Sequence, residues 1–244
     1  MDLIDKAINN PQNPIEFDIE DMWTNGPKKF ENIDEYVNWF DASIDFKENY
    51  KMGYIDFYNR ILTMDMYNYI GDPRDKSCLE IGFGGGRLLN ASSRVFNQAF
   101  GVDILNNESI NRTKVLLNDN GCNNVHLYNR KDINQIEDKS IDFVYSFIVI
   151  QHFSGWDMVE FYLKHIDRML TDTGVGILYF GRNDFNDDDI YTKTPHLKGC
   201  SLYNKPEFIR NRLGEQFNVI EIGEITKAPW NNLRSGQFFA KFKR

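Results

Sequence analysis

The sequence predicts an α/β fold, in which helices cover both faces of a mostly parallel sheet. Two observations support this prediction. From Ser77 onward, short apolar runs alternate with segments of helical periodicity, and such alternation is typical of parallel sheets covered by helices. A stretch rich in glycine also stands directly between the first of these strands and the first of these helices. The chain has 244 residues, of which 41% are hydrophobic, so it is long enough for one such domain.

The first 75 residues are predicted to form a helical cap within the same domain. Val37, Phe40 and Ile44 recur at helical spacing, and a second apolar series of this kind runs from residue 54 to residue 66. These series predict two or three helices, which end near residues 71–73 because glycine and proline stop a helix there. We therefore divide the chain into a cap, residues 1–75, and a core, residues 76–244.

The core is predicted to contain seven strands and four helices. The last two strands are joined by a loop without helical periodicity, so they should form an antiparallel hairpin rather than a crossover. The strands are expected at Cys78–Ile81, Ala99–Val102, Val125–Leu127, Ile141–Phe147, Val175–Phe180, Phe217–Ile222 and Gln237–Phe242. The helices are expected at Arg87–Phe96, Glu108–Asn118, Asp157–Leu170 and Pro206–Glu215.

Charge and cysteine content exclude several classes of protein. The 28 basic and 36 acidic residues give a net charge of −8, which disfavours nucleic acid as a partner because phosphate binding depends on clustered basic side chains. The apolar runs are much shorter than the ~20 residues that cross a bilayer, so no membrane association is expected. Three widely spaced cysteines without a C-x-x-C motif fit a protein of the reducing cytoplasm.

The glycine-rich stretch has the spacing Gly82, Gly84 and Gly86, with Glu80 in the strand before it. Such a turn at the carboxyl end of a first strand is where open α/β sheets bind nucleotides. The dinucleotide pattern would require a third glycine at Arg87, and no Gly-Lys-Ser/Thr follows for a phosphate-binding loop. An acidic residue beside the loop suits the sulfonium and ammonium groups of S-adenosylmethionine better than it suits phosphates.

Two more carboxylates follow the next two strands. Asp103 ends the second strand, where a carboxylate accepts hydrogen bonds from both ribose hydroxyls of a nucleotide. Asp132 and Ile133 come shortly after the third strand, where the carboxylate could accept a hydrogen bond from an adenine amine while Ile133 lies against the ring.

In this order and spacing, the pieces from about Ser77 to Phe180 resemble the class I S-adenosylmethionine-dependent methyltransferases, in particular those that act on small molecules. The resemblance implies a three-layer, Rossmann-like, seven-stranded sheet whose last strand is antiparallel. It also implies S-adenosyl-L-methionine as cofactor and S-adenosyl-L-homocysteine as product. One turn departs from the family pattern: Leu170-Thr171-Asp172-Thr173-Gly174 has one glycine and no proline before the fifth strand.

The resemblance assigns roles to ten residues by their positions. Glu80, Gly82, Gly84 and Gly86 would form the loop at the methionine side, Asp103 would hold the ribose, Ile104, Asp132 and Ile133 would hold the adenine, and Ser146 and Phe147 would line the methionine side.

His152 is the candidate catalytic residue. It follows the fourth strand, where many small-molecule members of this family carry a histidine, and it would act as a general base or contact the acceptor. The alternative is that His152 only packs the loop. No metal site is predicted, because the spacing of His196 and Cys200 has no second pair of ligands to complete it.

The acceptor site is expected to be shaped by parts outside the conserved core pattern. These are the aromatic residues of the cap, including Trp23 and Trp39, the acidic insert Arg182–Gly199, and the loop Lys227–Arg234 with Trp230. We predict methyl transfer to an oxygen or nitrogen atom of a small metabolite or a sugar-containing intermediate, and the negative net charge favours a neutral or cationic one. The alternatives are a protein or RNA methyltransferase and a non-catalytic member that binds the cofactor or a partner. A monomer or homodimer is expected.

Overall fold

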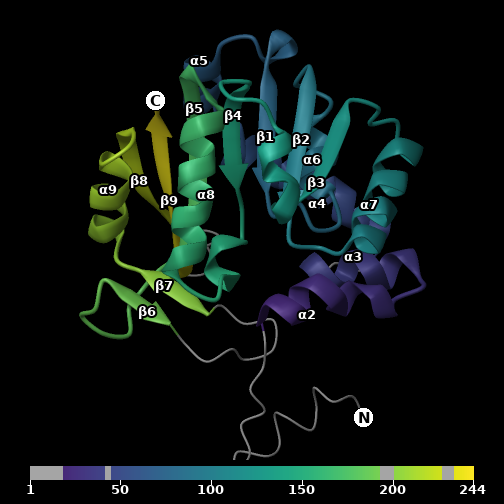
Figure 1. Ribbon diagram of the computed structural model, residues 1–244, viewed down its shortest axis with the longest axis horizontal. Helices are drawn as coiled ribbons and strands as arrows, with labels where there is room; N and C mark the ends of the chain where they lie inside the picture. The colour runs from purple at the N-terminus through teal and green to yellow at the C-terminus, as the bar shows by residue number, and fades with distance from the viewer. Residues whose placement is uncertain (1–18, 42–44, 193–200, 227–233) are drawn as a thin grey trace, which may run out of the picture.

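Seven strands form one sheet in the order β3-β2-β1-β4-β5-β9-β8. The structure is a computed structural model that describes residues 19–41, 45–192, 201–226 and 234–244. Figure 1 shows the carboxyl ends of the parallel strands together at the lower edge of the sheet. The strands are β1 (Ser77–Ile81), β2 (Gln98–Asp103), β3 (Val125–Asn129), β4 (Ile141–Ser146), β5 (Leu170–Gly181), β8 (Asn218–Thr226) and β9 (Arg234–Lys243).

The strand pairing confirms the predicted sheet. Strands β3, β2, β1, β4 and β5 are parallel to one another, and β9 is antiparallel to both β5 and β8. The turn expected before the fifth strand is wrong in detail, because β5 already begins at Leu170. Leu170 pairs with Ile141, and Val175 pairs with Phe143, so the extra residues form an irregularity within the strand pair.

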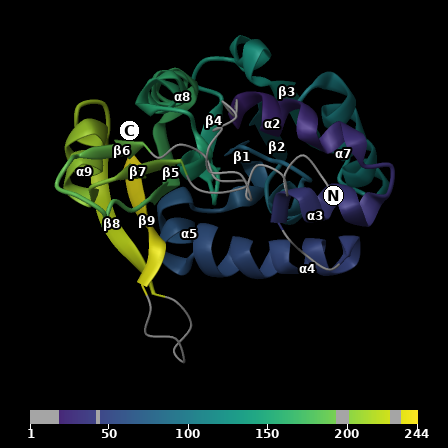
Figure 2. The same cartoon turned by 90° about the horizontal axis from the view of Figure 1, so that it is seen from below.

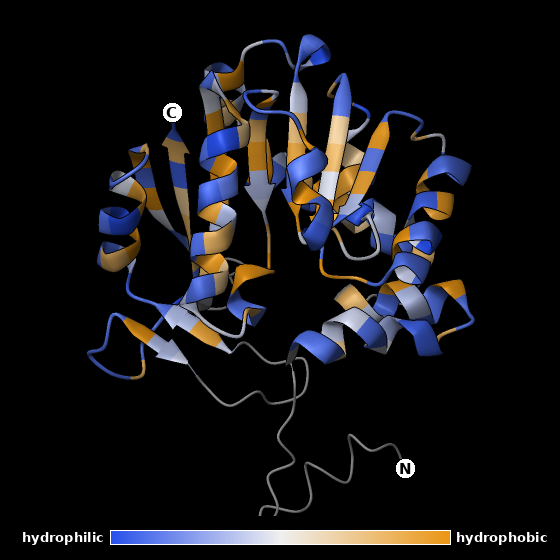
Figure 3. Cartoon of the chain, in the orientation of Figure 1, coloured by the Kyte–Doolittle hydropathy of each residue, from blue (hydrophilic) through white to orange (hydrophobic). Residues whose placement is uncertain are grey.

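Alternate residues of the central strands pack on opposite faces of the sheet, as extended backbone requires. In β4, Phe143 and Tyr145 belong to the core beneath the N-terminal helices, whereas Val144 belongs to the core beneath α8. Figure 3 shows these strands as predominantly hydrophobic, with polar residues on the outer faces of the helices. The core helices are α6 (Arg87–Ser92), α7 (Asn107–Asp119), α8 (Trp156–Met169) and α9 (Pro206–Gly214).

The N-terminal helices cover one face of the sheet and its carboxyl edge. Helices α4 (Phe46–Asp56) and α5 (Met64–Ile70) run along one face, with α8 on the opposite side (Figure 2). A single π-helical segment, η2 (Phe57–Ile61), joins them. Helices α2 (Ile19–Asn25) and α3 (Ile33–Asp41) lie at the carboxyl edge. The boundary near residue 75 between the N-terminal cap and the core stays a prediction.

The acidic insert contains a feature that the sequence did not indicate. Strand β6 (Ile190–Thr192) pairs with β7 (Leu202–Asn204) to form a second, two-stranded antiparallel sheet. Residues 193–200, which include the end of the insert, lie outside the described part of the chain, and so does most of the loop that carries Trp230. No helix in the described residues is long and apolar enough to cross a membrane.

Candidate active site

The glycine loop after β1 adopts backbone angles that only glycine takes readily. Gly82, Gly84 and Gly86 have φ values of +78°, +49° and +82°, in the left-handed region that a Cβ atom disfavours. A Cβ atom on Gly82 would lie 2.3 Å from Cγ1 of Val149. The loop therefore needs glycine both for its backbone angles and because Val149 packs directly against Gly82.

Asp103 lies at the end of β2 and fixes this loop from the side. Its Oδ2 atom accepts the Gly84 backbone N–H at 2.8 Å, and its Oδ1 atom accepts the N–H groups of Ile104 and Leu105 at 2.7 and 3.3 Å. The side chain is only 8% exposed, and burial raises its pKa to about 6, although the three hydrogen bonds act in the opposite direction. Asp103 is thus a buried carboxyl group whose charge changes around pH 6.

Glu80 in β1 is the second buried carboxylate, with 3% exposure. Tyr145 stands opposite it in the register of β4 and donates its hydroxyl to Glu80 Oε2 at 3.2 Å. The same hydroxyl lies 2.9 Å from Ser92 Oγ in α6. Burial raises the pKa of Tyr145 well above its usual range, so the phenol stays protonated and can donate. Strand β4 and helix α6 therefore both restrict where the Glu80 carboxylate points.

A cavity at the carboxyl edge brings most of the predicted site residues together. Its empty volume is about 920 Å³, which includes the space at its open mouth. Helix α2 contributes Glu20 and Trp23 to its wall. The predicted residues that line it are Glu80, Gly82, Gly84, Asp103, Ile104, Phe147 and His152.

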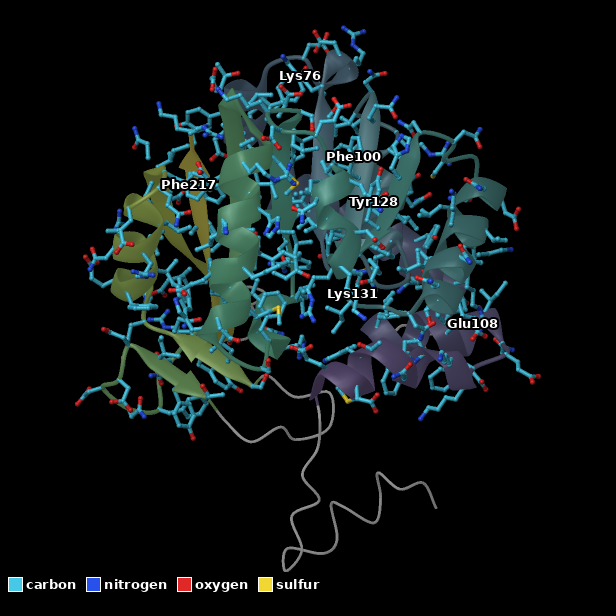
Figure 4. The ribbon with its side chains drawn as sticks, viewed as in Figure 1. Lys76, Phe100, Glu108, Tyr128, Lys131 and Phe217 are labelled. Carbon is cyan, nitrogen blue, oxygen red and sulfur yellow. The ribbon has the colours of Figure 1, made fainter. Side chains whose placement is uncertain are left out.

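Four predicted residues lie outside this lining. Gly86 is the N-cap residue of α6, and Ser146 is buried with its hydroxyl donating to the Ile81 carbonyl at 3.1 Å. Asp132 is exposed in η4 (Arg130–Gln135), beside Lys131 (Figure 4), and lines a separate, shallower pocket.

Ile133 is only 1% exposed and packs in the core beneath α8. The roles of Asp132 and Ile133 in adenine binding thus stay predictions that the cavity does not support. The cavity lining also includes Leu105, Arg130, Met158 and Tyr162.

An ion pair between distant parts of the chain closes one side of the cavity. Arg130 Nη2 lies 3.1 Å from Glu20 Oε2, which joins η4 to α2, and its Nη1 lies 2.9 Å from the sulfur of Met158 in α8. Ser154 Oγ also donates to Glu20, at 3.4 Å. No local motif pointed to Arg130 or Glu20, because each belongs to an ordinary charged helix and they meet only in the folded chain.

His152 ends the short helix η5 (Ile150–His152) and lines the cavity. Its ring centre lies 5.1 Å from that of Trp23 in α2, and its Nε2 atom lies 3.3 Å from Nε2 of Gln151. The histidine thus faces the cavity between the end of β4 and the N-terminal helix α2. Among the described residues, no group of three or more His, Cys, Asp or Glu side chains is arranged to hold a metal ion.

Part of the sequence matches a known protein family. Residues 79–178 match a family described as a methyltransferase domain. This segment begins in β1, ends in β5 and includes the glycine loop, Asp103 and His152. No match is found among curated protein sequences.

Solved structures share the fold over nearly the whole chain. Magnesium protoporphyrin IX methyltransferase from Synechocystis, with bound S-adenosylhomocysteine, has a TM-score of 0.62 at 14% identity and covers 93% of this chain and 98% of its own. A methyltransferase from Clostridium acetobutylicum has a TM-score of 0.56 at 15% identity, with 86% and 96% covered. One from Aquifex aeolicus has a TM-score of 0.55 at 14% identity, with 82% and 99% covered.

Proposed function

Residues 79–178 form a methyltransferase domain of the class I, S-adenosylmethionine-dependent type, and on this premise we propose that the protein methylates an oxygen or nitrogen atom of a small-molecule acceptor. The observation that carries the proposal is the cavity in which Glu80, Gly82 and Asp103 meet under the N-terminal helix α2. A concave cavity that is covered by a helix can hold a small molecule more readily than it can receive the surface of a macromolecule.

The residues around the cavity suit S-adenosylmethionine. Gly82 and Gly84 line the cavity, and glycine lets a ligand approach the backbone closely because it has no Cβ atom. Glu80 and Asp103 are carboxylates in a buried setting, and such groups favour positively charged and hydroxyl-bearing ligands. We propose that Glu80 and the loop hold the methionine end, that Asp103 accepts the ribose hydroxyls, and that Ile104 flanks the adenine.

When bound, the cofactor supplies a methyl group on a positively charged sulfur for displacement in line with the acceptor atom. The contribution of the protein is mainly to position the acceptor close to that methyl group and to exclude water. His152 faces the cavity beside Trp23, so we propose that it contacts the acceptor and takes a proton from it if the acceptor is a hydroxyl. Phe147, directly after β4, forms the wall beneath the acceptor.

A labelling experiment tests the acceptor class. The purified protein is incubated with S-adenosylmethionine carrying a tritiated methyl group and a cell extract that has been divided by ultrafiltration into small and large molecules. We expect a labelled product, separated from the labelled cofactor by chromatography, with the small-molecule fraction only. Label in protein or RNA would refute the proposed acceptor class without affecting the assignment as a methyltransferase.

We also propose that the protein resides in the cytoplasm. Cys78 and Cys122, the two described cysteines, are both unpaired and buried, which supports the cytoplasm as the compartment.

A further inference from the structure

Two arginines share one carboxylate beside the proposed acceptor site. Arg87 Nη1 lies 2.6 Å from Asp56 Oδ2, and Arg60 Nε lies 3.3 Å from Asp56 Oδ1. The guanidinium carbons of Arg87 and Arg60 lie 5.8 and 5.9 Å from the centre of the Phe147 ring. We call Arg60 and Arg87 the arginine pair. Two positive side chains thus approach one aromatic ring and one carboxylate.

The position of the arginine pair along the sheet separates it from the ribose site. Phe147 follows β4, and its ring packs against Tyr179 of β5 at 4.8 Å. The hydroxyl of Tyr179 donates to the Arg60 backbone carbonyl at 2.7 Å. Since the strand order is β2-β1-β4-β5, Asp103 at the end of β2 and Phe147 after β4 lie on opposite sides of β1 and its glycine loop. The arginine pair, which contacts Phe147, therefore lies on the β4–β5 side of the site, away from Asp103.

Guanidinium groups bind carboxylates through a planar fork of N–H donors. Arg87 lines the cavity, whereas Arg60 lies outside the lining and contacts the same Phe147 ring. The ion pair of Arg60 uses its Nε atom, and its side chain is 39% exposed. Aromatic residues that line the same cavity include Phe40, Phe147 and Trp23. We propose that the acceptor is an aromatic carboxylate whose carboxylate group binds the arginine pair. This inference rests on the proposed function.

The bound carboxylate orients the acceptor and is not itself the atom that receives the methyl group. Methylation of a carboxylate removes its negative charge, so cations that stabilise the charge oppose the transfer. Methylation of a hydroxyl or amine elsewhere on the acceptor leaves the carboxylate charge in place, so the arginines do not oppose it. The arginine pair therefore anchors one end of the acceptor, and the other end carries the oxygen or nitrogen atom that is methylated.

Binding of matched probes tests the inference. Benzoate, salicylate and cinnamate are each titrated into the complex with S-adenosylhomocysteine and compared with their uncharged carboxamides by calorimetry and ligand-observed NMR. The same titrations are made with Arg60→Gln, Arg60→Lys and Arg87→Gln. Lys51→Gln is the matched control, since Lys51 lies on the same helix as Asp56, is 70% exposed and pairs with Glu48 instead.

We expect at least one carboxylate to bind the wild type and Lys51→Gln at least tenfold more tightly than its carboxamide. Arg60→Gln and Arg87→Gln should remove this preference, Arg60→Lys should keep part of it, and affinity for S-adenosylhomocysteine should change less than threefold. Equal binding of acid and amide, or no binding of any carboxylate, would refute the inference.

A loss of S-adenosylhomocysteine affinity in Arg87→Gln would also refute it, because the arginine would then serve the cofactor. Arg60→Gln removes a partly exposed side chain, so it remains informative if the buried Arg87 variant fails to fold. Failure of the wild type to bind S-adenosylhomocysteine would instead contradict the proposed function itself.

Discussion

If Asp103 holds the ribose as proposed, cofactor binding should depend on pH, and Asp103→Asn should abolish that dependence. The ribose hydroxyls donate hydrogen bonds, and an ionised carboxylate accepts them more strongly than a neutral carboxyl group does. Burial raises the pKa of Asp103 from 3.8 to about 6 in the ligand-free protein. The affinity for S-adenosylmethionine should therefore fall as the pH decreases below about 6, and calorimetry across this range measures it.

The size of the effect follows from the titration. If only the ionised form binds, the dissociation constant is multiplied by about 1.1 at pH 7 and about 11 at pH 5 for a pKa of about 6. The wild type should thus bind about tenfold more weakly at pH 5 than at pH 7. Asp103→Ala should bind at least tenfold more weakly at pH 7, since a hydrogen bond to a charged group contributes about 1.5–3 kcal/mol.

Stability should change with the opposite sign. A carboxyl group with a raised pKa stabilises the folded state when neutral, fully below about pH 4, and this contribution is lost as the pH rises through about 6. The loss is about 3 kcal/mol, from about two pKa units at ~1.4 kcal/mol each. Denaturant unfolding should therefore show Asp103→Asn gaining stability relative to the wild type from pH 4 to pH 7.

Two results would refute this reasoning. If the wild type binds S-adenosylmethionine equally well at pH 5 and pH 7, Asp103 does not titrate in the relevant range or does not contact the ribose. If Asp103→Asn retains the same slope with pH, another group is responsible.

Three further substitutions test the remaining parts of the site. His152→Ala should lower turnover and leave the affinity for S-adenosylmethionine intact; unchanged turnover would return the histidine to a packing role. Gly82→Ala should lower the melting temperature and the cofactor affinity more than Gly71→Ala does, because Gly71 shares a φ near +77° but has open space around it; equal effects would mean that backbone strain alone matters. Tyr145→Phe should weaken cofactor binding two- to tenfold by releasing Glu80, in line with ~0.5–1.5 kcal/mol for one hydrogen bond, and equal affinities would show that Glu80 needs no such support.

The sheet and the glycine loop could be predicted because their signals are local. Each strand is a short apolar run, and the loop needs glycine at positions where the backbone has positive φ. Asp103 was found for the same reason, since the last residue of β2 lies at the sheet edge in any parallel arrangement. Such features depend on the chain within a few residues, and a sequence displays them directly.

Contacts between distant segments could not be predicted in this way. Glu20 and Arg130 are separated by 110 residues and meet only because α2 folds over the carboxyl edge. The small sheet of β6 and β7 was missed because each strand has three residues, too few for a periodic pattern. The placement of Asp132 in a second pocket depends on how η4 turns after β3, and spacing along the chain does not determine that direction.

The net charge of the chain and the charge of the arginine pair lead to opposite expectations for the acceptor, and under the inference above the arginine pair should decide. A net charge of −8 favours a neutral or cationic acceptor, but charges farther away than the Debye length, about 8 Å at physiological ionic strength, are largely screened by solvent. Arg60 and Arg87 lie within 6 Å of the Phe147 ring centre, and Arg87 lies in the cavity wall, where a lower dielectric strengthens each interaction. An anionic acceptor would thus approach slowly through the negative field of the whole protein and yet bind well once inside. Higher salt should accordingly increase its association rate.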